Sequence, residues 1–273
     1  MSDTRIMCAS RGSALLVVVA ALLCGATALH AQTSLGAAAP FGVLGNSTVT
    51  NTGSTTVVGD VGVSPGTSLT GGLMVIGATH VADAVAAQAQ YDAAQAYAYF
   101  AGLPFTTDLT GLDLGGMVLT PGVYRFASSA QLTGNLFLDF LGNSAARFVF
   151  QIGSTLTTAS GSSVSGLDGL FGPNVFFNVG SSATLGTTTA FQGSILANQS
   201  VTLTTGATIA CGRAIALNAA VTLDHNTIST VCPAAEVVPP VTTTPEPASI
   251  VLLATGLAGV LGMSRQRSLR RSK

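Results

Sequence analysis

Charged and aromatic side chains are scarce in this chain of 273 residues. Only 8% of the residues are charged, 6% are aromatic, and tryptophan is absent. Disordered chains combine low hydrophobicity with high charge, whereas 48% of the residues here are hydrophobic. The chain is therefore expected to fold, and its 32 glycines and many small residues favour a narrow, repetitive structure over a wide aromatic core.

Positive charge is nearly missing from the middle of the chain. Between residues 32 and 244, three arginines stand against eight aspartates and one glutamate, a formal charge of −6. Nucleic acid is therefore excluded as a partner, because phosphate binding requires clustered cations. The other seven cationic residues lie near the two ends: Arg5, Arg11, Arg265, Arg267, Arg270, Arg271 and Lys273.

Groupings of catalytic side chains are also missing. Polysaccharide hydrolases and lyases require paired carboxylates, or a calcium-binding aspartate cluster with a basic residue. Asp108 and Asp113 are close in sequence but lie in a turn-rich segment, and neither His80 nor His225 has a serine or cysteine partner. We therefore expect no enzyme and no cofactor. The isolated aspartates are more typical of turns: Asp60, Asp139, Asp168 and Asp224.

The N-terminal segment has the pattern of a secretory signal peptide. Arg5 and Arg11 precede an apolar run over residues 14–23, and small residues follow. This pattern predicts a signal peptide over residues 1–31, cleaved after Ala31 or alternatively after Ala28. A retained membrane helix is the other interpretation.

Cysteine is rare, with four residues in the whole chain. Cys8 and Cys24 would leave with the signal peptide, which leaves Cys211 and Cys232 in the mature chain. An even pair in an exported protein predicts a disulfide bond. A metal site is not expected, because two thiols stand without a nearby cluster of ligands.

The C-terminal end reads as a sorting segment rather than as part of the fold. A linker rich in proline and threonine (residues 234–244) precedes an apolar run over residues 248–263 and a basic tail. As a helix, that run would rise about 24 Å against a bilayer core of about 30 Å, with the basic tail on the cytoplasmic side. The whole segment, 245–273, begins with Pro245, Glu246 and Pro247.

Those three residues, the short span and the arginine cluster together resemble the PEP-CTERM sorting signal of Gram-negative bacteria. The resemblance implies processing by an exosortase and export to the cell surface or into extracellular polymer. A permanent membrane anchor is the alternative.

A short phrase recurs four times between residues 153 and 228. The copies read LTTASGSSV, VGSSATL, VTLTTGATI and VTLDHNTI. Recurrence at roughly 20–30 residues is typical of a solenoid, in which each turn is stabilised only by stacking on its neighbours. Because side chains alternate along a strand, we expect an outward hydroxyl ladder of Ser163, Thr184, Thr208 and Thr227. A second column three residues upstream would hold Ser160, Ser181, Thr205 and Asp224.

A helix is expected between two regions of strand. Residues 79–101 carry an alanine stripe at helical spacing, with Thr79 as the cap, Asp83 in the first turn, and Gly102 and Pro104 beyond the end. Strand-and-turn sequence precedes the helix over residues 35–75 and resumes from Leu109.

The order of several phrases resembles the ice-binding protein family of bacteria, diatoms and fungi. These phrases include FGVL at Phe41, GDVGVSPG at Gly59, ADAVAAQ at Ala82, LTPGVY at Leu119 and FVFQIGSTLTT at Phe148, and they span residues 35–229. The resemblance implies a right-handed, three-sided β-solenoid over residues 32–233, with one long helix packed alongside and a non-consecutive order of coils near the N-terminus.

The resemblance also implies adsorption to ice through one flat face bearing Thr-[Ala/Gly]-x-[Thr/Asn]. The stretches from Thr52 to Thr55 and from Thr205 to Thr208 fit this pattern. Those from Ser160 to Ser163 and from Ser181 to Thr184 are degenerate versions, and serine lacks the methyl group that stiffens threonine. The other hypothesis is a non-enzymatic matrix or adhesion protein bound to exopolysaccharide, although glycan binding would favour exposed aromatic side chains.

Overall fold

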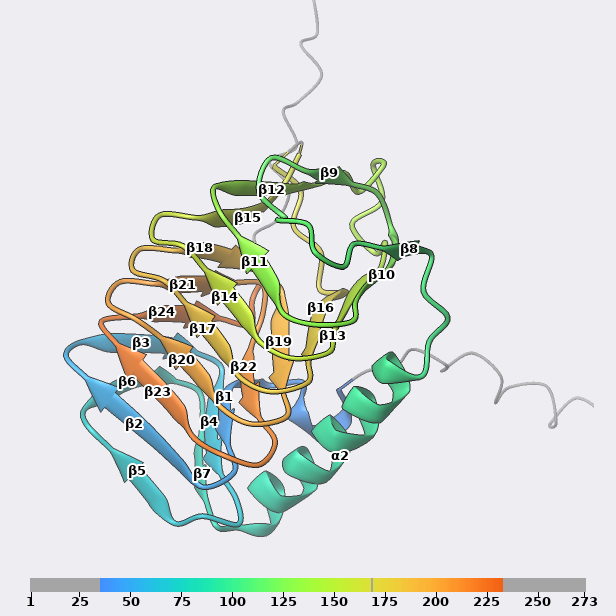
Figure 1. Ribbon diagram of the computed structural model, residues 1–273. Helices are drawn as coiled ribbons and strands as arrows, with labels where there is room; N and C mark the ends of the chain where they lie inside the picture. Colours follow the sequence, from blue (N-terminus) through green and yellow to red (C-terminus); the bar gives the residue numbers. More distant parts are fainter. Residues whose placement is uncertain (1–34, 168, 233–273) are drawn as a thin grey trace, which may run out of the picture. The chain divides into compact units, whose positions relative to one another are not determined.

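The computed structural model describes residues 35–167 and 169–232, and within them three parallel sheets form the sides of a prism (Figure 1). Each turn of the chain adds one strand to each side, so a coil here means three successive strands, one per sheet. We call the sheets walls A, B and C, in the order in which the chain visits them. The expected three-sided solenoid with an accompanying helix is confirmed.

Wall A has nine strands and wall B has seven. In spatial order, wall A contains β7 (Thr79–Val81), β4 (Asp60–Val63), β1 (Phe41–Gly45), β22 (Ala214–Ala216), β19 (Ser194–Ala197), β16 (Val175–Val179), β13 (Phe148–Ile152), β10 (Gly122–Phe126) and β8 (Thr107–Asp108). Wall B contains β11 (Ala130–Leu132), β14 (Leu156–Thr158), β17 (Ala183–Leu185), β20 (Val201–Leu203), β23 (Val221–Asp224), β2 (Thr48–Thr52) and β5 (Ser68–Thr70).

Wall C has eight strands and completes the prism. Its order is β6 (Leu73–Ile76), β3 (Thr55–Val58), β24 (Thr227–Ser229), β21 (Thr208–Ala210), β18 (Ala190–Gln192), β15 (Ser163–Gly166), β12 (Asn135–Leu138) and β9 (Val118–Leu119). The strands pair in parallel in all three walls, as a continuously wound coil requires.

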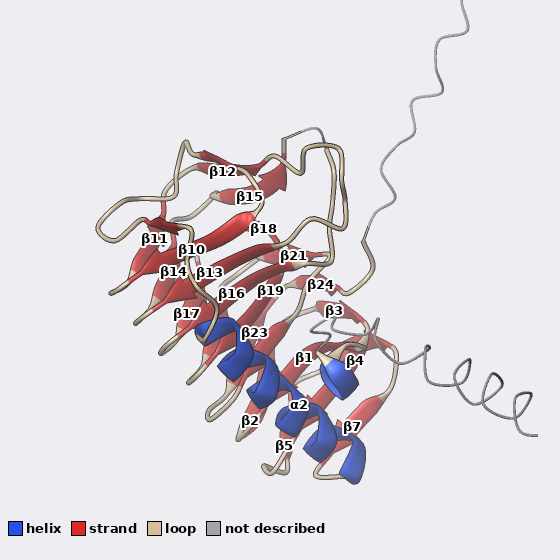
Figure 2. Ribbon diagram, turned by 90° about the vertical axis from the view of Figure 1, so that its right-hand side faces the viewer, coloured by secondary structure: helices blue, strands red, loops and turns tan. Residues whose placement is uncertain are grey.

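The coils do not stack in the order of the sequence. The coil β1–β2–β3 lies against β22–β23–β24, the last coil of the described chain, and β4–β5–β6 lies outside it. The chain then passes along wall A in helix α2 (Ala84–Ala101) and resumes at the opposite end with β8 (Figures 1 and 2). The non-consecutive order implied by the family resemblance is therefore present.

Helix α2 packs on wall A through its alanine stripe. Ala86, Ala89, Ala93 and Phe100 are buried, and the Phe100 ring stacks on Phe176 of wall A at 4.4 Å between centroids. The predicted cap was wrong: Thr79 lies in strand β7, and Asp83 caps the helix by accepting a hydrogen bond from the Ala86 N–H at 2.8 Å. A short 3₁₀ helix, η1 (Gly36–Ala38), lies beside α2, and the Ala37 N–H donates to Asp92.

The prism interior is narrow and filled by one layer of side chains from each wall. Phe150 and Phe177 of wall A stack at 4.3 Å with their planes 6° apart. Aliphatic residues close the wall B side, including the buried Val201 and Leu203 on either side of the outward Thr202. A small number of aromatic rings is sufficient to fill the interior, because each wall is only three to five residues wide along much of its length.

Cys211 and Cys232 form a disulfide bond, as expected from the sequence. The signal peptide, the linker and the sorting segment lie outside the described residues. Within the described ranges, no helix is long and apolar enough to cross a membrane.

Candidate ice-contacting surface

Wall B carries a continuous column of outward threonines. Six of the seven wall B strands carry an outward threonine, and the pairing register places these threonines side by side on successive coils. Adjacent strands lie about 4.8 Å apart, so six consecutive threonines extend over about 24 Å. The column, which we call the threonine column, consists of Thr157, Thr184, Thr202, Thr222, Thr50 and Thr70, with Gln131 preceding it on β11.

A second outward column runs two residues upstream along the same strands. Hydroxyl groups of neighbouring coils hydrogen-bond within it: Thr155 donates to Ser129 at 2.9 Å, and Ser200 donates to Ser182 at 2.9 Å. These contacts hold the side chains in place before any ligand arrives. The register assigns the column Ser129, Thr155, Ser182, Ser200, Ala220, Thr48 and Ser68.

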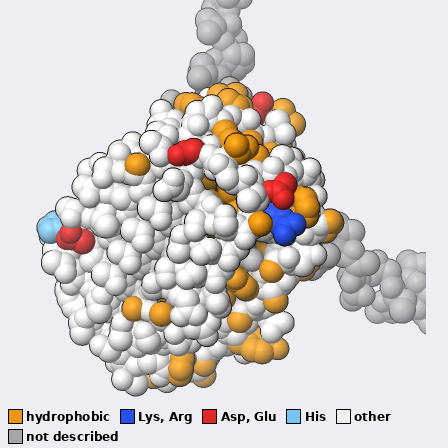
Figure 3. Space-filling model, viewed as in Figure 1, with side chains coloured by type: hydrophobic (Ala, Val, Ile, Leu, Met, Phe, Trp, Pro, Cys, Tyr) orange, Lys and Arg blue, Asp and Glu red, His pale blue; other side chains and the backbone are white. Residues whose placement is uncertain are grey.

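Wall B is almost free of charge and of large apolar side chains. Figure 3 shows its strands in front, with polar uncharged atoms across the centre and charged groups only towards the margins. At the margin with wall C, Asp224 accepts hydrogen bonds from Thr205 and from His225 Nδ1, the latter at 2.6 Å. These two bonds, the one from Thr205 foremost, hold the pKa of Asp224 below its usual value.

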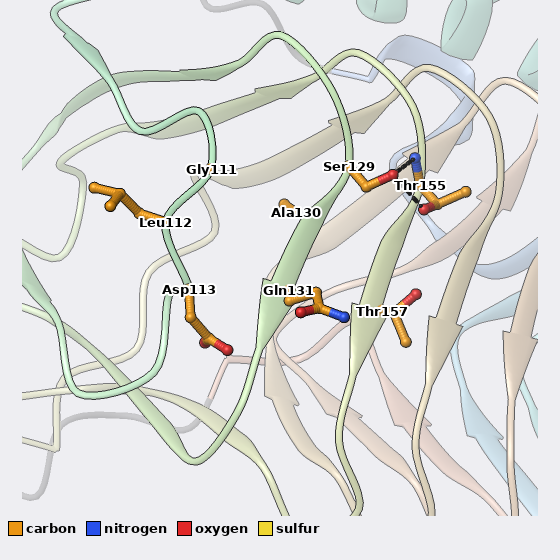
Figure 4. A pocket seen from close by; sticks show the side chains of 8 residues that line it. All are labelled: Gly111, Leu112, Asp113, Ser129, Ala130, Gln131, Thr155 and Thr157. Atoms are coloured by element: carbon orange, nitrogen blue, oxygen red, sulfur yellow. Dashed lines mark hydrogen bonds between the residues drawn. The ribbon is translucent and has the colours of Figure 1, made fainter.

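A raised loop bounds wall B at its β11 end. Asp113 forms a single bridge with Gln131, and its carboxylate accepts the Gly115 and Thr133 N–H groups at 2.7 and 2.8 Å. Between this loop and the strands lies a hollow of about 440 Å³. Leu112 belongs to its lining, but the Leu112 side chain points away from the sheet (Figure 4). The hollow has one carboxylate and no adjacent histidine or second acid, so it lacks a catalytic pair. Its lining consists of Gly111, Leu112, Asp113, Ser129, Ala130, Gln131, Thr155 and Thr157.

The predicted hydroxyl ladder was wrong, because its four members do not share one wall. Thr184 lies on wall B, whereas Ser163, Thr208 and Thr227 lie on wall C. The wall C residue in register with Ser163 and Thr208 is Ala190. The second phrase of the repeat, VGSSATL, turns from wall A to wall B, while the other three turn from wall B to wall C.

Most residues of the second predicted column and of the Thr-x-x-Thr motifs lie in or beside the turns that connect one wall to the next. Ser160 and Thr205 lie in turns between walls B and C, and Ser181 lies in the turn between walls A and B. Thr52 ends strand β2 in register with Asp224. Thr55 is only 1% exposed, and its hydroxyl accepts the Asn226 N–H, so it is excluded from any contact surface.

Sequence reasoning missed five of the six members of the threonine column. The signal that identifies them is a tripeptide with threonine in the middle, such as Val-Thr-Leu at 201–203 and 221–223 or Ala-Thr-Leu at 183–185. Wall C offers a less regular surface, because Ala190 and Met74 interrupt its outward row. Within the described ranges, no three potential metal-ligating side chains come together.

Residues 43–229 match the protein family described as Ice-binding-like, and residues 243–267 match the PEP-CTERM protein-sorting motif. The chain is 52% identical over 239 residues to an ice-binding protein of Nostoc sp. (strain HG1), covering 85% of this chain and 87% of the relative. A crystal structure of an ice-binding protein from Antarctomyces psychrotrophicus superimposes with a TM-score of 0.67 at 38% identity, covering 72% and 97% of the two chains. An ice-binding protein from an Antarctic biological consortium gives 0.69 at 43% identity, covering 72% and 90%.

Proposed function

Because the chain belongs to the family of ice-binding-like proteins, we propose that it adsorbs to ice through wall B. The family is non-enzymatic, which agrees with the expectation from the sequence. The observation that supports wall B is the threonine column, six hydroxyl-and-methyl side chains in register on consecutive coils.

The chemistry of threonine suits this task. Its branched Cβ restricts χ1, so each hydroxyl and each methyl group is held in a narrow range of positions above the sheet. Rows of such groups order the adjacent water into a regular layer, which merges with the surface of a crystal. The contribution of each contact is small, but the rigid scaffold keeps the entropy cost of ordering low, so many contacts act together.

Adsorbed molecules then stop the growth of the crystal locally. The ice front advances only between the bound molecules and becomes curved, which makes further growth unfavourable. The effect requires a flat surface without charges that bind water in other geometries, and the centre of wall B meets this requirement (Figure 3).

The direct test measures thermal hysteresis and inhibition of ice recrystallisation with the purified exported chain. We expect activity in the parent and its loss when Thr184 is replaced by tyrosine, because a bulky ring lifts the neighbouring coils away from the ice. The Thr227→Tyr variant, on wall C, is the matched control and should retain activity. A parent without either activity, or equal loss in both variants, would rule out wall B.

The sorting motif at residues 243–267 supports an exported, surface-sorted protein. We propose that an exosortase of a Gram-negative cell processes residues 245–273, that the segment engages the membrane before processing, and that residues 1–31 direct export. Association with exopolysaccharide is the second candidate function, and the same motif favours it. A polysaccharide array probed with the exported chain separates the two, since wall B variants would weaken binding to ice but leave binding to glycan unchanged.

A further inference from the structure

A hollow of about 290 Å³ lies between the C-terminal end of helix α2 and wall A, at the edge where wall A meets wall B. Tyr97 and Ala101 of the helix form one side of it, and strands β10, β13 and β16 with the turns that follow them form the other. Its volume is close to the lower end of the range for small-molecule sites, about 300–1,000 Å³. None of its lining residues belongs to the threonine column, so it is a separate feature of the surface.

Three polar side chains in one row form the wall A side of this hollow. The pairing register places Arg125, Gln151 and Asn178 side by side on β10, β13 and β16, so neighbours are about 4.8 Å apart. The row supplies a guanidinium, which only donates hydrogen bonds, and two amides, which both donate and accept. No carboxylate is among the described residues that line the hollow. The chemistry therefore suits the binding of a ligand rather than acid–base catalysis.

Helix α2 and the residues that follow it fix the orientation of the two amides. The Gln151 Nε2 group donates to the carbonyls of Phe100 and Leu103 at 2.7 and 2.8 Å, and the Asn178 Nδ2 group donates to the Tyr97 carbonyl at 3.2 Å. Each amide oxygen is thereby left as the acceptor for a ligand. Asn178 is only 3% exposed, and its Oδ1 atom has no hydrogen-bond partner within the described ranges. A buried acceptor without a partner is uncommon in folded proteins, and a ligand that donates a hydrogen bond would complete it.

The acceptor and the guanidinium together select the chemistry of the ligand. The Asn178 oxygen requires a donor and would repel a carboxylate or a phosphate, whereas Arg125 requires an acceptor. Asp108 lies beside Arg125 in the same row, so the row carries no net charge and does not favour an anion. A sugar meets both requirements without a charge, because each hydroxyl group donates one hydrogen bond and can accept two.

Two aromatic rings border the row of polar groups. The half-buried Tyr97 lines the hollow, and the exposed Phe105 ring lies 5.0 Å from the Arg125 guanidinium, which is held over its face. Small-molecule sites combine aromatic side chains with a few placed polar groups that fix the orientation of the ligand. A sugar ring has apolar C–H faces and hydroxyl groups around its edge, so it matches a surface of this kind.

We propose that this hollow binds a neutral saccharide unit of an extracellular polysaccharide. The assignment rests on the second candidate function, association with exopolysaccharide, and gives that function a site. The hollow and the threonine column use different residues. Binding to glycan can therefore be removed by mutation without changing the surface assigned to ice.

The test fills the hollow from its helix side. Ala101→Trp places an indole ring in it, and Ala98→Trp places the same ring on an exposed part of α2 outside the lining, as the matched control. The full-length parent and both variants are applied to an array of neutral and uronate-containing oligosaccharides. We expect the parent to bind neutral oligosaccharides, Ala101→Trp to bind them roughly tenfold more weakly or worse, and Ala98→Trp to bind as the parent does. Urea unfolding verifies that both variants are folded.

The other outcomes separate this site from the function on which it rests. Equal binding of neutral oligosaccharides by both folded variants would overturn the site and leave exopolysaccharide association standing. A parent that binds only uronate-containing oligosaccharides would overturn the neutral ligand. A parent that binds no oligosaccharide of the array would reject the second candidate function, and the site with it.

A second measurement locates the ligand without any mutation. The oligosaccharide that binds most tightly on the array is titrated into the isotope-labelled full-length chain, and the side-chain amide resonances are followed by NMR. Those of Asn178 and Gln151 should shift, while that of the exposed Gln199 on wall B should not. A bound oligosaccharide that leaves the Asn178 resonance in place would overturn the assignment.

Discussion

Thr202 lies directly opposite Thr222 on neighbouring strands, at the centre of the threonine column. Both side chains point outward, while Val201 and Val221 beside them are fully buried. The outer surface of wall B and the packing of the core can therefore be changed separately, which makes the function of the wall accessible to mutation.

The Thr202→Tyr variant should lose ice adsorption without losing stability. We expect ice affinity to fall by roughly tenfold or more, which corresponds to about 1.4 kcal/mol, because the ring prevents close approach over several coils. Thr208→Tyr on wall C should keep the parent activity, and both variants should unfold within about 0.5 kcal/mol of the parent. Ice-affinity partitioning and urea unfolding measure the two effects, and equal partitioning of both variants would contradict the assignment.

Replacing Gln151 by leucine should loosen the end of helix α2. Its amide donates to the carbonyls of Phe100 and Leu103 at 2.7 and 2.8 Å, at the point where the helix runs out of internal partners. Leaving these carbonyls unpaired should cost about 1–3 kcal/mol of unfolding free energy. Hydrogen exchange should show faster exchange in the last turn of α2. Gln199→Leu, an exposed control, should change neither quantity.

Removing the disulfide should lower stability but leave wall B intact. With Cys211 and Cys232 both changed to serine, we expect a loss of about 3 kcal/mol, as estimated for a closed loop of this length. Thermal unfolding with and without reductant measures the effect in the parent. Ice adsorption measured near freezing should be retained, because the bond lies on the edge opposite wall B. A parent whose melting temperature does not respond to reductant would contradict the expected contribution.

Low pH should weaken the hydrogen bonds that the Asp224 carboxylate accepts at the margin between walls B and C. The pKa of this carboxyl is held below its usual value by hydrogen bonds from Thr205 and His225. Its contribution to stability is therefore complete above the unfolded pKa of about 3.9 and is lost as the pH falls through the lower pKa of the folded state. Asp224→Asn should thus be less stable than the parent at neutral pH, and the difference should shrink in strong acid. Urea unfolding over a pH series checks this, and a constant difference would contradict it.

The class of fold could be predicted from the sequence, but the wall on which each hydroxyl lies could not. Recurring phrases and the alanine stripe indicated a solenoid and one helix, because both depend on local periodicity. The assignment of walls failed at residues 179–185, where Ser-Ser-Ala-Thr-Leu in a turn from wall A to wall B resembles the turns from wall B to wall C. In this coil the turn from wall B to wall C ends in Ala190 and Phe191 instead. Because alanine stands there in place of a hydroxyl residue, the repeat cannot be recognised at this point of the sequence.

The stacking order of the coils was also beyond local reasoning. Nothing near Val49 or Thr50 indicates that β2 pairs with β23, more than 170 residues away. The family resemblance implied only a non-consecutive order of coils near the N-terminus, and the pattern along one strand does not specify which strand pairs with it. The exact members of the threonine column depend on this long-range pairing.

Helix α2 carries the chain from one end of the stack of coils to the other, so its length is related to the number of coils. Its 18 residues rise about 27 Å at 1.5 Å per residue, and each coil occupies about 4.8 Å. Inserting one more coil between its ends would therefore demand about three additional helical residues, or β8 could no longer reach its place. The length of the threonine column is thus coupled to a segment that never contacts it, and relatives with longer columns should have proportionally longer helices.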